Sequence, residues 1–466
     1  MQARWKWLAV RGLAALTALT AQGARPAHAQ PSAANDARVT IDAGTLRGET
    51  AGGVARYLGV PFAKPPVGAL RWAPPEPPAP WEGERDATKY QLPCYQTTDA
   101  DGTTVNAGGV SGPSSEDCLY LNVYAPAKAD GRAPVMVWFY GGGNEVGGAH
   151  LGTYDGQSFA ERGVVVVTLN YRLGAAGWFA HPKLTAAAAP SAPLVSYGSM
   201  DQTEALRWVQ RNIARFGGDA KNVTIFGQSA GGYGVYAQLV APSAQGLFHK
   251  AMVHSATYVR ANPSLAEVEA RGVQRATSWG LDGATATLDQ LRSVPVEKLG
   301  GGVGGAVDGR YFVEPWMTSL PYKRHARVPF VVGGNSGEGT LWARDRWIAS
   351  QFAEAGVPAF QYHFSHVRQS LDRALGAQHS AELRFVWNTL RDWTSAENDA
   401  VADAMHPCWV AFAFYDGSGP IDCGNGIVWP AFTQTEHPVV EFTTAGPTVH
   451  KQFRTDEAWV DALRAR

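Results

Sequence analysis

The amino-acid sequence predicts an α/β fold in which helices cover both faces of a mostly parallel central sheet. Several short segments are apolar on both faces, including residues 135–140 (VMVWFY) and 164–169 (VVVVTL), and such strands are buried on both faces of a sheet. Residues 201–216 carry apolar side chains near helical spacing, as a crossover between parallel strands requires. A further strand leads into a G-x-S-x-G turn at residues 227–231 and then into a second helix.

Length and composition are those of a globular protein. The chain has 466 residues, of which 45% are hydrophobic, so it can bury a large core. No internal repeat is visible and no stretch separates a second domain, so we expect residues 30–466 to form a single domain. The formal charge is −1 and no basic block is present, which argues against a nucleic-acid partner.

Residues 1–29 have the pattern of a signal peptide. Three basic residues precede an apolar run at residues 13–21, and residues 27–29 (AHA) form an A-x-A cleavage site. The alternative is an N-terminal membrane anchor, but this run is too short to span a bilayer, and no other segment is long enough. We therefore expect a secreted or periplasmic protein that starts near Gln30 and has no stable membrane insertion.

The four cysteines fit an exported chain, because disulfides persist outside the cytoplasm. They fall into two pairs that are local in the sequence, Cys94 with Cys118 and Cys408 with Cys423, and this is the pairing that we favour. Four cysteines allow three connectivities, so the other two stay open. The spacings match no common zinc motif, and we expect no metal site.

The strands are expected in a definite order along the chain. Residues 38–81 form short strands and turns that end in a proline-rich extended segment (PPEPPAPW), and residues 99–115 form a surface loop. Beyond this loop, strands alternate with helices. The expected strands are residues 119–124, 134–140, 164–170, 223–226, 251–254, 328–332 and 359–364.

Two helices are expected around the G-x-S-x-G turn. One spans residues 201–216, with Asp201 as a possible N-terminal cap, and the other includes residues 232–240. Residues 261–304 are helical at first and then rich in glycine, and we expect them to form an excursion above the sheet.

Ser229 is the candidate nucleophile. It lies on the tight turn between the strand at residues 223–226 and the following helix, where Gly227, Ala230 and Gly231 allow the two elements to approach closely. A serine hydroxyl needs a base, a group that orients the base, and donors for the oxyanion of the attacked carbonyl. A lone G-x-S-x-G is more often an ordinary turn, so these partners decide the question.

The oxyanion donors are expected in a glycine run. The run Tyr140-Gly141-Gly142-Gly143 follows directly on the strand at residues 134–139, and the N–H groups of Gly142, Gly143 and Ala230 supply three backbone donors. The alternative is a plain glycine-rich loop.

At this point the chain resembles the type-B carboxylesterases, an α/β-hydrolase family that includes cholinesterases and some fungal lipases. The resemblance covers essentially the whole mature chain and implies an α/β-hydrolase fold that needs no cofactor. The segments that resemble the family, apart from the oxyanion glycines, are residues 59–72 (GVPFAKPPVGALRW), 116–124 (EDCLYLNVY), 170–174 (NYRLG), 201–232 and 429–430 (WP).

The resemblance also implies the acid and the base of a catalytic triad. The family's acid is usually a Glu before Gly on a loop after a strand, which matches Glu338, whereas Asp308 is a weaker competitor and a solvated loop carboxylate is the ordinary alternative. The family's G-A-x-H-x-x-E motif matches residues 376–382 and makes His379 the base. His363 and His366 lie nearby but lack these flanking residues.

Three features depart from the family pattern. Only 41 positions separate Glu338 from His379, so we expect a reduced cap region. Gln228 stands where many relatives have Glu, and Asn144 stands where an aromatic residue is common.

The sequence therefore predicts a secreted serine hydrolase that cleaves carboxylic esters of small molecules through an acyl-enzyme. One alternative is a lipase or a specialised detoxifying esterase. Another is a catalytically impaired binding protein, because of the short segment before His379. Trp316, Trp342 and Trp347 fit a core as well as a pocket wall, and the oligomeric state stays open.

Overall fold

The computed structural model describes residues 35–97, 110–256, 263–433, 435–454 and 458. The signal peptide expected at residues 1–29 and most of the expected loop at residues 99–115 lie outside these described residues.

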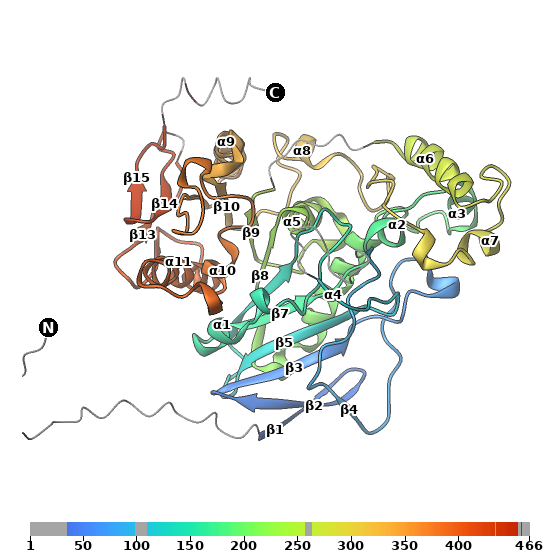
Figure 1. Cartoon of the computed structure of the whole chain (residues 1–466), viewed down its shortest axis with the longest axis horizontal. Helices are drawn as coiled ribbons and strands as arrows, with labels where there is room; N and C mark the ends of the chain where they lie inside the picture. The colour runs from blue at the N-terminus through green and yellow to red at the C-terminus, as the bar shows by residue number, and fades with distance from the viewer. Residues whose placement is uncertain (1–34, 98–109, 257–262, 434, 455–457, 459–466) are drawn as a thin grey trace, which may run out of the picture.

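A 13-stranded mixed sheet forms the centre of the molecule (Figure 1). Its strand order is β1-β2-β3-β5-β7-β6-β8-β9-β10-β11-β14-β15, with β4 beside β2. Neighbouring strands from β7 to β14 are parallel, and the strands beyond them at both ends are antiparallel except for β4. The bounds are β1 Asn35–Ile41, β2 Gly44–Ala51, β3 Val54–Pro61, β4 Glu84–Asp86, β5 Tyr120–Pro126, β6 Ala133–Phe139, β7 Val165–Leu169, β8 Gly218–Gln228, β9 Lys250–His254, β10 Phe330–Asn335, β11 Ala359–Phe364, β14 Val439–Thr443 and β15 Gly446–His450; β12 Ile421–Asp422 and β13 Val428–Trp429 form a separate pair.

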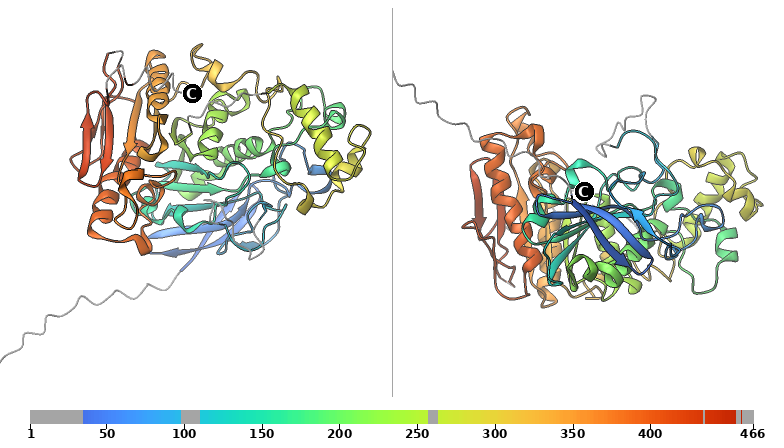
Figure 2. Two further views of the ribbon diagram at one scale, coloured as in Figure 1. Left: turned by 45° about the horizontal axis from the view of Figure 1, so that its top comes forward. Right: turned by 90° about the horizontal axis from the view of Figure 1, so that it is seen from below.

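The mostly parallel sheet predicted from the sequence is confirmed, and the expected strands coincide with β5 to β11. Most bounds agree within two or three residues. β8 begins at Gly218, five residues before the expected start, because it pairs with β6 along a longer stretch that begins at Ala133. The first and last strands of the chain lie at opposite ends of the sheet (Figures 1 and 2).

Helices cover both faces of this sheet. On one face, Phe330 of β10 packs against Tyr236 of α5 and stacks on Phe352 of α9. On the other face, Trp138 of β6 packs against Trp387, which follows α10. The helices are α1 Gln157–Glu161, α2 Gly174–Gly177, α3 Pro182–Ala187, α4 Tyr197–Asn212, α5 Ala230–Val240, α6 Leu265–Ser278, α7 Leu288–Arg292, α8 Trp316–Ser319, α9 Leu341–Glu354, α10 Leu383–Val386 and α11 Ala396–Phe414.

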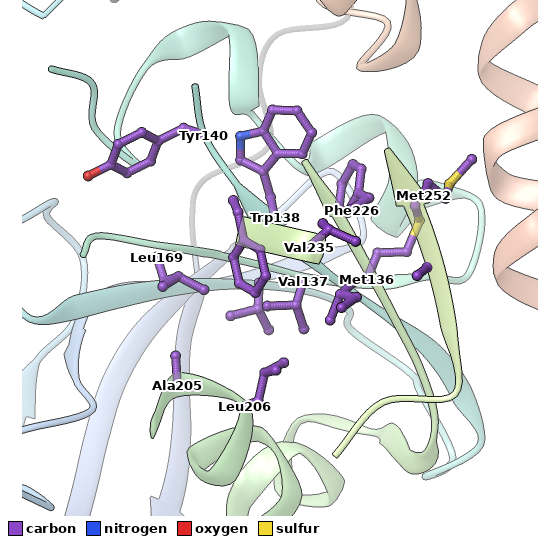
Figure 3. Close-up of a cluster of buried hydrophobic side chains, with 14 of the residues drawn as sticks. Met136, Val137, Trp138, Tyr140, Leu169, Ala205, Leu206, Phe226, Val235 and Met252 are labelled. Carbon is purple, nitrogen blue, oxygen red and sulfur yellow. The ribbon is translucent and has the colours of Figure 1, made fainter. Parts of the chain in front are cut away.

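Alternation along β6 divides the core into two layers. Val137 lies on the side of Ala205 and Leu206 of α4, whereas Trp138 lies beside Phe226 of β8 (Figure 3). All five side chains are fully buried. Because successive side chains of a strand point to opposite faces, the continuous apolar run of β6 fills both layers.

The prediction that Asp201 caps its helix is wrong. α4 begins at Tyr197, preceded by Ser196, so Asp201 lies inside the helix and is fully buried. Its carboxylate accepts hydrogen bonds from Arg172 through Nε (2.9 Å), Nη2 (2.7 Å) and the backbone N–H (3.0 Å). A buried carboxylate requires such a partner, and the pair fixes the loop after β7 to α4. An isolated helical pattern does not reveal a partner on a distant loop.

The excursion expected at residues 261–304 contains α6 and α7. These helices lie beside α3, at the end of the molecule remote from α10 and α11 (Figure 1). A capping box starts α6. The side chain of Ser264 accepts a hydrogen bond from the backbone N–H of Glu267, and the side chain of Glu267 accepts one from the backbone N–H of Ser264.

Two disulfides join Cys94 to Cys118 and Cys408 to Cys423, the pairs that the sequence favoured. They are consistent with an extracellular location. None of the helices in the described ranges combines the length and the apolar character that crossing a membrane requires.

Candidate active site

Ser229 occupies a one-residue turn between β8, which ends at Gln228, and α5, which begins at Ala230. Its backbone angles are φ 55° and ψ −123°, a region that residues with a side chain rarely adopt. Its N–H donates to the carbonyl of His254 at 2.9 Å, which ties the turn to the end of β9. The serine is therefore held out at the carboxyl end of the sheet by a strained backbone.

The glycine at position 231 is dictated by packing. A Cβ on Gly231 would lie 1.9 Å from the carbonyl oxygen of Phe139, at the end of β6. A Cβ on Gly227 would lie 2.4 Å from the carbonyl oxygen of Gly231. The sequence assigned these two glycines to a close approach, and the approach brings α5 against β6 as well as β8. Because the turn is so short, α5 begins two residues before the expected position.

The predicted oxyanion glycines follow β6. Gly142 and Gly143 have φ angles of 114° and 69°, and the carbonyl of Gly142 accepts hydrogen bonds from the N–H groups of Glu145 and Val146. A Cβ on Gly141 would lie 3.1 Å from the Cβ of Ser229, so this loop runs against the serine. Within the described ranges, the N–H groups of Gly142, Gly143 and Ala230 donate to no protein acceptor, which leaves them free for a bound oxygen.

Glu338 ends a short 3-10 turn after β10 and is nearly buried, with 3% of its side chain exposed. One carboxylate oxygen accepts hydrogen bonds from the hydroxyl of Ser255 (2.7 Å) and the N–H of Asn335 (2.7 Å). The other oxygen contacts Nδ1 of His379. Hydrogen bonds from two elements thus fix the carboxylate in front of the imidazole.

His379 lies on the loop between β11 and α10, with 39% of its side chain exposed. Burial lowers the pKa of His379, but the hydrogen bond and the charge of Glu338, with the charge of Glu382 added, raise it above the ordinary value. Nδ1 faces a carboxylate and therefore carries a proton. In the neutral ring, Nε2 is then the basic nitrogen.

Gln228 occupies the position next to that nitrogen. Its Nε2 lies 3.1 Å from Nε2 of His379 and donates to it, since the imidazole proton is on the opposite side. No hydrogen bond joins Ser229 to His379 among the described residues. The side chain that departs from the family pattern thus holds the histidine beside the serine in this structure.

Glu382 is a functional candidate that the sequence analysis missed. It is the final Glu of the G-A-x-H-x-x-E motif at residues 376–382, to which the sequence assigned no role. Glu382 is fully buried, and its Oε2 accepts a hydrogen bond from Nδ2 of Asn335 at 2.6 Å. Its Oε1 lies 3.8 Å from Nδ1 of His254, whose Nε2 accepts from Trp409 at 3.1 Å. Burial and the charge of Glu338 raise the pKa of Glu382 to about 7. Burial lowers the pKa of His254 to about 3, so this ring is neutral.

The competing residues lie elsewhere. The carboxylate of Asp308 accepts hydrogen bonds from backbone N–H groups of its own turn and from Leu194. His366 is hydrogen-bonded to Asn398 and Thr444, and His363 packs against Phe453. Within the described residues, none of the three is hydrogen-bonded to Glu338, His379 or Ser229, although His363 lies opposite Gly334 of β10.

A cavity of about 530 Å³ opens at Ser229. Trp316 lines it, whereas Trp342 packs against Phe453 and Trp347 packs against the main core. Only α9, β11 and loops separate Glu338 from His379, as expected for a reduced cap. The described part of the chain holds no group of three or more metal-ligating side chains. The lining residues are Gly143, Asn144, Trp178, Ser199, Gln202, Ser229, Ala230, Tyr233, Gly234, Ala237, Pro263, Arg271, Gly304, Gly305, Phe312 and Trp316.

Sequence relatives point to one class of enzyme. The chain is 31% identical over 453 residues to fumonisin B1 esterase of Sphingopyxis macrogoltabida, an alignment that covers 82% of each protein. It is 29% identical over 522 residues to cholinesterase of Mus musculus, covering 90% of this chain and 85% of that protein. With para-nitrobenzyl esterase of Bacillus subtilis it shares 41% identity over 263 residues, which span 56% of this chain and 51% of the relative.

Solved structures agree with these relatives. A PNB esterase structure superposes with a TM-score of 0.77 at 28% identity, covering 91% of this chain and 99% of that chain. A Geobacillus stearothermophilus carboxylesterase gives a TM-score of 0.76 at 28% identity, with the same coverage. The sequence profile of the carboxylesterase family matches residues 35–347. The chain therefore belongs to the carboxylesterase family, has the α/β-hydrolase fold and is a carboxylic-ester hydrolase.

Proposed function

We propose that the protein hydrolyses small-molecule carboxylic esters through an acyl-enzyme, with Ser229, His379 and Glu338 as its catalytic triad. The observation that carries this proposal is the fixed contact between the carboxylate of Glu338 and Nδ1 of His379. It leaves Nε2 as the base at the turn that carries Ser229. No cofactor takes part in this chemistry.

The reaction begins when the hydroxyl of Ser229 replaces the Gln228 amide as the hydrogen-bond partner of His379 Nε2. The imidazole then takes the serine proton as Oγ attacks the ester carbonyl, and the N–H groups of Gly142, Gly143 and Ala230 stabilise the negative oxygen. His379 passes the proton to the leaving alcohol, which leaves an acyl group on Ser229. Water repeats the two steps and releases the acid, while Glu338 stabilises the imidazolium in both halves.

The relatives are named for esters of fumonisin B1, choline and para-nitrobenzyl alcohol. What they share is the ester bond. They support a small ester as the substrate of this chain. The choice of acyl group depends on the residues that line the cavity.

Export is a second part of the proposal. Residues 1–29 act as a signal peptide, residues 30–466 form one catalytic domain, and the mature protein is secreted or periplasmic. The two disulfides support this location. The intact mass of the exported protein should correspond to a chain that begins at or near Gln30, and a mass that includes the leader would refute cleavage.

The triad is tested by exposing the purified protein to a fluorophosphonate and measuring its intact mass. We expect a single adduct on the wild type and none on Ser229→Ala, with turnover of 4-nitrophenyl esters reduced by at least about 10⁴-fold in that variant. Ser243→Ala, at an exposed serine remote from the turn, is the matched control and should be labelled like the wild type. A folded wild type without an adduct would overturn the triad and favour the impaired binding protein.

A further inference from the structure

The lining of the cavity at Ser229 includes polar side chains that the triad does not use. We propose that Arg271, the charged member of this lining, binds an anionic group of the substrate, so that the preferred esters carry a carboxylate in the same molecule as the ester bond. The inference rests on the proposed function, because it concerns the cavity of the same serine.

Arg271 supplies the only charged side chain among the described residues that line the cavity. It lies on α6, in the excursion beyond the sheet, and its Nη1 donates to the carbonyl of Val303 at 3.3 Å. This single bond to an uncharged group leaves most of the five guanidinium donors for other acceptors. A cavity with one positive charge and no carboxylate favours an anionic ligand.

No protein carboxylate neutralises this guanidinium by direct contact in the described part of the chain. Two acidic residues precede Arg271 on α6. Glu269 accepts a hydrogen bond from the hydroxyl of Thr185. Glu267, one turn earlier, has its pKa lowered by its hydrogen bonds from Ser264 and, to a smaller extent, by the charge of Arg271. The carboxylate of Glu267 accepts hydrogen bonds from the hydroxyl and the backbone N–H of Ser264 in the capping box. The next arginine on the helix, Arg275, does not line the cavity.

Two buried polar side chains from α4 line the same cavity. Gln202 is 1% exposed, and its Oε1 accepts a hydrogen bond from Gln238 at 3.4 Å. Its Nε2 donates to no acceptor among the described residues, and neither does the hydroxyl of the buried Ser199. Both residues line the cavity, so these polar groups are available to hydrogen-bond a ligand there.

Trp178, Phe312 and Trp316 add aromatic surface to the lining of the same cavity. Trp316 is held in place by stacking on Tyr236, with ring centroids 4.2 Å apart. The cavity therefore fits a substrate whose hydrocarbon part lies between an ester group at Ser229 and an anionic end at Arg271. A carboxylate matches the planar fork of a guanidinium.

The test compares esters that differ only in the terminal group. Mono-4-nitrophenyl adipate against 4-nitrophenyl hexanoate places the carboxylate on the acyl side, and 6-acetoxyhexanoate against hexyl acetate, followed by pH-stat, places it on the alcohol side. We expect the wild type to prefer the anionic ester in one of the two pairs. In Arg271→Gln the ratio of kcat/KM for anionic over neutral ester should fall about tenfold, mainly through KM.

Two variants keep the inference falsifiable. Arg271→Lys keeps the charge and should retain part of the preference, whereas Arg275→Gln, one turn further along α6, should retain the wild-type ratio. Added salt should lower the preference of the wild type, because a partly exposed contact is screened. An unchanged ratio in Arg271→Gln for both pairs, or an equal fall in Arg275→Gln, would overturn the inference. If the wild type cleaves none of the four esters and takes up no fluorophosphonate, the proposed function itself has failed.

Discussion

The proposed nucleophile, Ser229, and the proposed acid–base pair, Glu338 and His379, are held in different ways. We call β6, β8, α5 and the loops at their ends the nucleophile edge, and β10 through α10 the acid–base arm. In the nucleophile edge, backbone positions Ser229: its N–H bonds to the carbonyl of His254, and Gly231 packs against the carbonyl of Phe139. In the acid–base arm, side chains contact other side chains: Glu338 contacts His379, and Nδ2 of Asn335 donates to Glu382.

The difference shows which parts of such a site depend on pH and on remote residues. Backbone contacts carry no titrating group, so the nucleophile edge keeps its geometry over a wide pH range. The acid–base arm includes Glu382, with its pKa raised to about 7, and His379, with its pKa also raised. The arm is thus the part of the site whose charge changes near neutral pH.

The largest effect is expected from breaking the acid–base arm at its centre. Glu338→Gln keeps the size of the side chain but removes the charge that fixes the tautomer of His379 and stabilises its protonated form. We expect kcat to fall by about 10³- to 10⁴-fold, with little change in the thermal midpoint.

The control for this variant is a second carboxylate–histidine pair outside the site. Glu441 accepts a hydrogen bond from Nε2 of His450 at 2.8 Å on β14 and β15. Glu441→Gln should leave kcat within about twofold of the wild type, as surface changes away from a site usually do. A similar loss in both variants would show that the arm has no special role.

A smaller effect, on stability, is expected from Glu382→Gln. Folding raises the pKa of Glu382 from 4.5 to about 7, so the folded wild type holds an extra proton between these values and loses stability as pH rises through them. Glutamine does not titrate, so the variant should gain roughly 3 kcal/mol relative to the wild type between pH 4.5 and pH 8.

Urea unfolding at several pH values measures this difference. At pH 4.5 the side chain at position 382 is neutral in the folded state of both proteins, which makes that pH the internal reference. A difference between the two proteins that stays constant with pH would contradict the raised pKa.

The smallest effect is expected at the contact between the two regions, from Gln228→Glu. A carboxylate beside Nε2 of His379 stabilises the protonated imidazole, so the pair holds its proton to higher pH. The acidic limb of the kcat/KM profile should move up by about one pH unit. Gln228→Met, which is similar in size and uncharged, should leave the limb within about 0.3 units of the wild type. A shift of equal size in both variants would mean that the pH position of the acidic limb depends on packing at residue 228 and does not depend on its charge.

Much of the nucleophile edge was predictable from the sequence because its causes are local. The apolar strands, the turn at Ser229 and the glycines after β6 are each contained in a few neighbouring residues. The acid and the base were identified only through resemblance to a family, since 41 positions separate Glu338 from His379 and periodicity does not relate them. The structure brings the two into contact.

What the sequence by itself determined is the central strands β5 to β11, the two helices around the turn and the identity of the chemical groups, because hydrophobic periodicity and turn chemistry act over short distances along the chain. Only the tertiary structure decided that Asp201 pairs with Arg172, that Gln228 contacts His379, and that Arg271 of α6 lines the cavity at Ser229. Each of these contacts joins segments whose approach depends on the packing of the whole sheet and its helices. A charge or an amide in one segment carries no signal of the partner that folding brings to it.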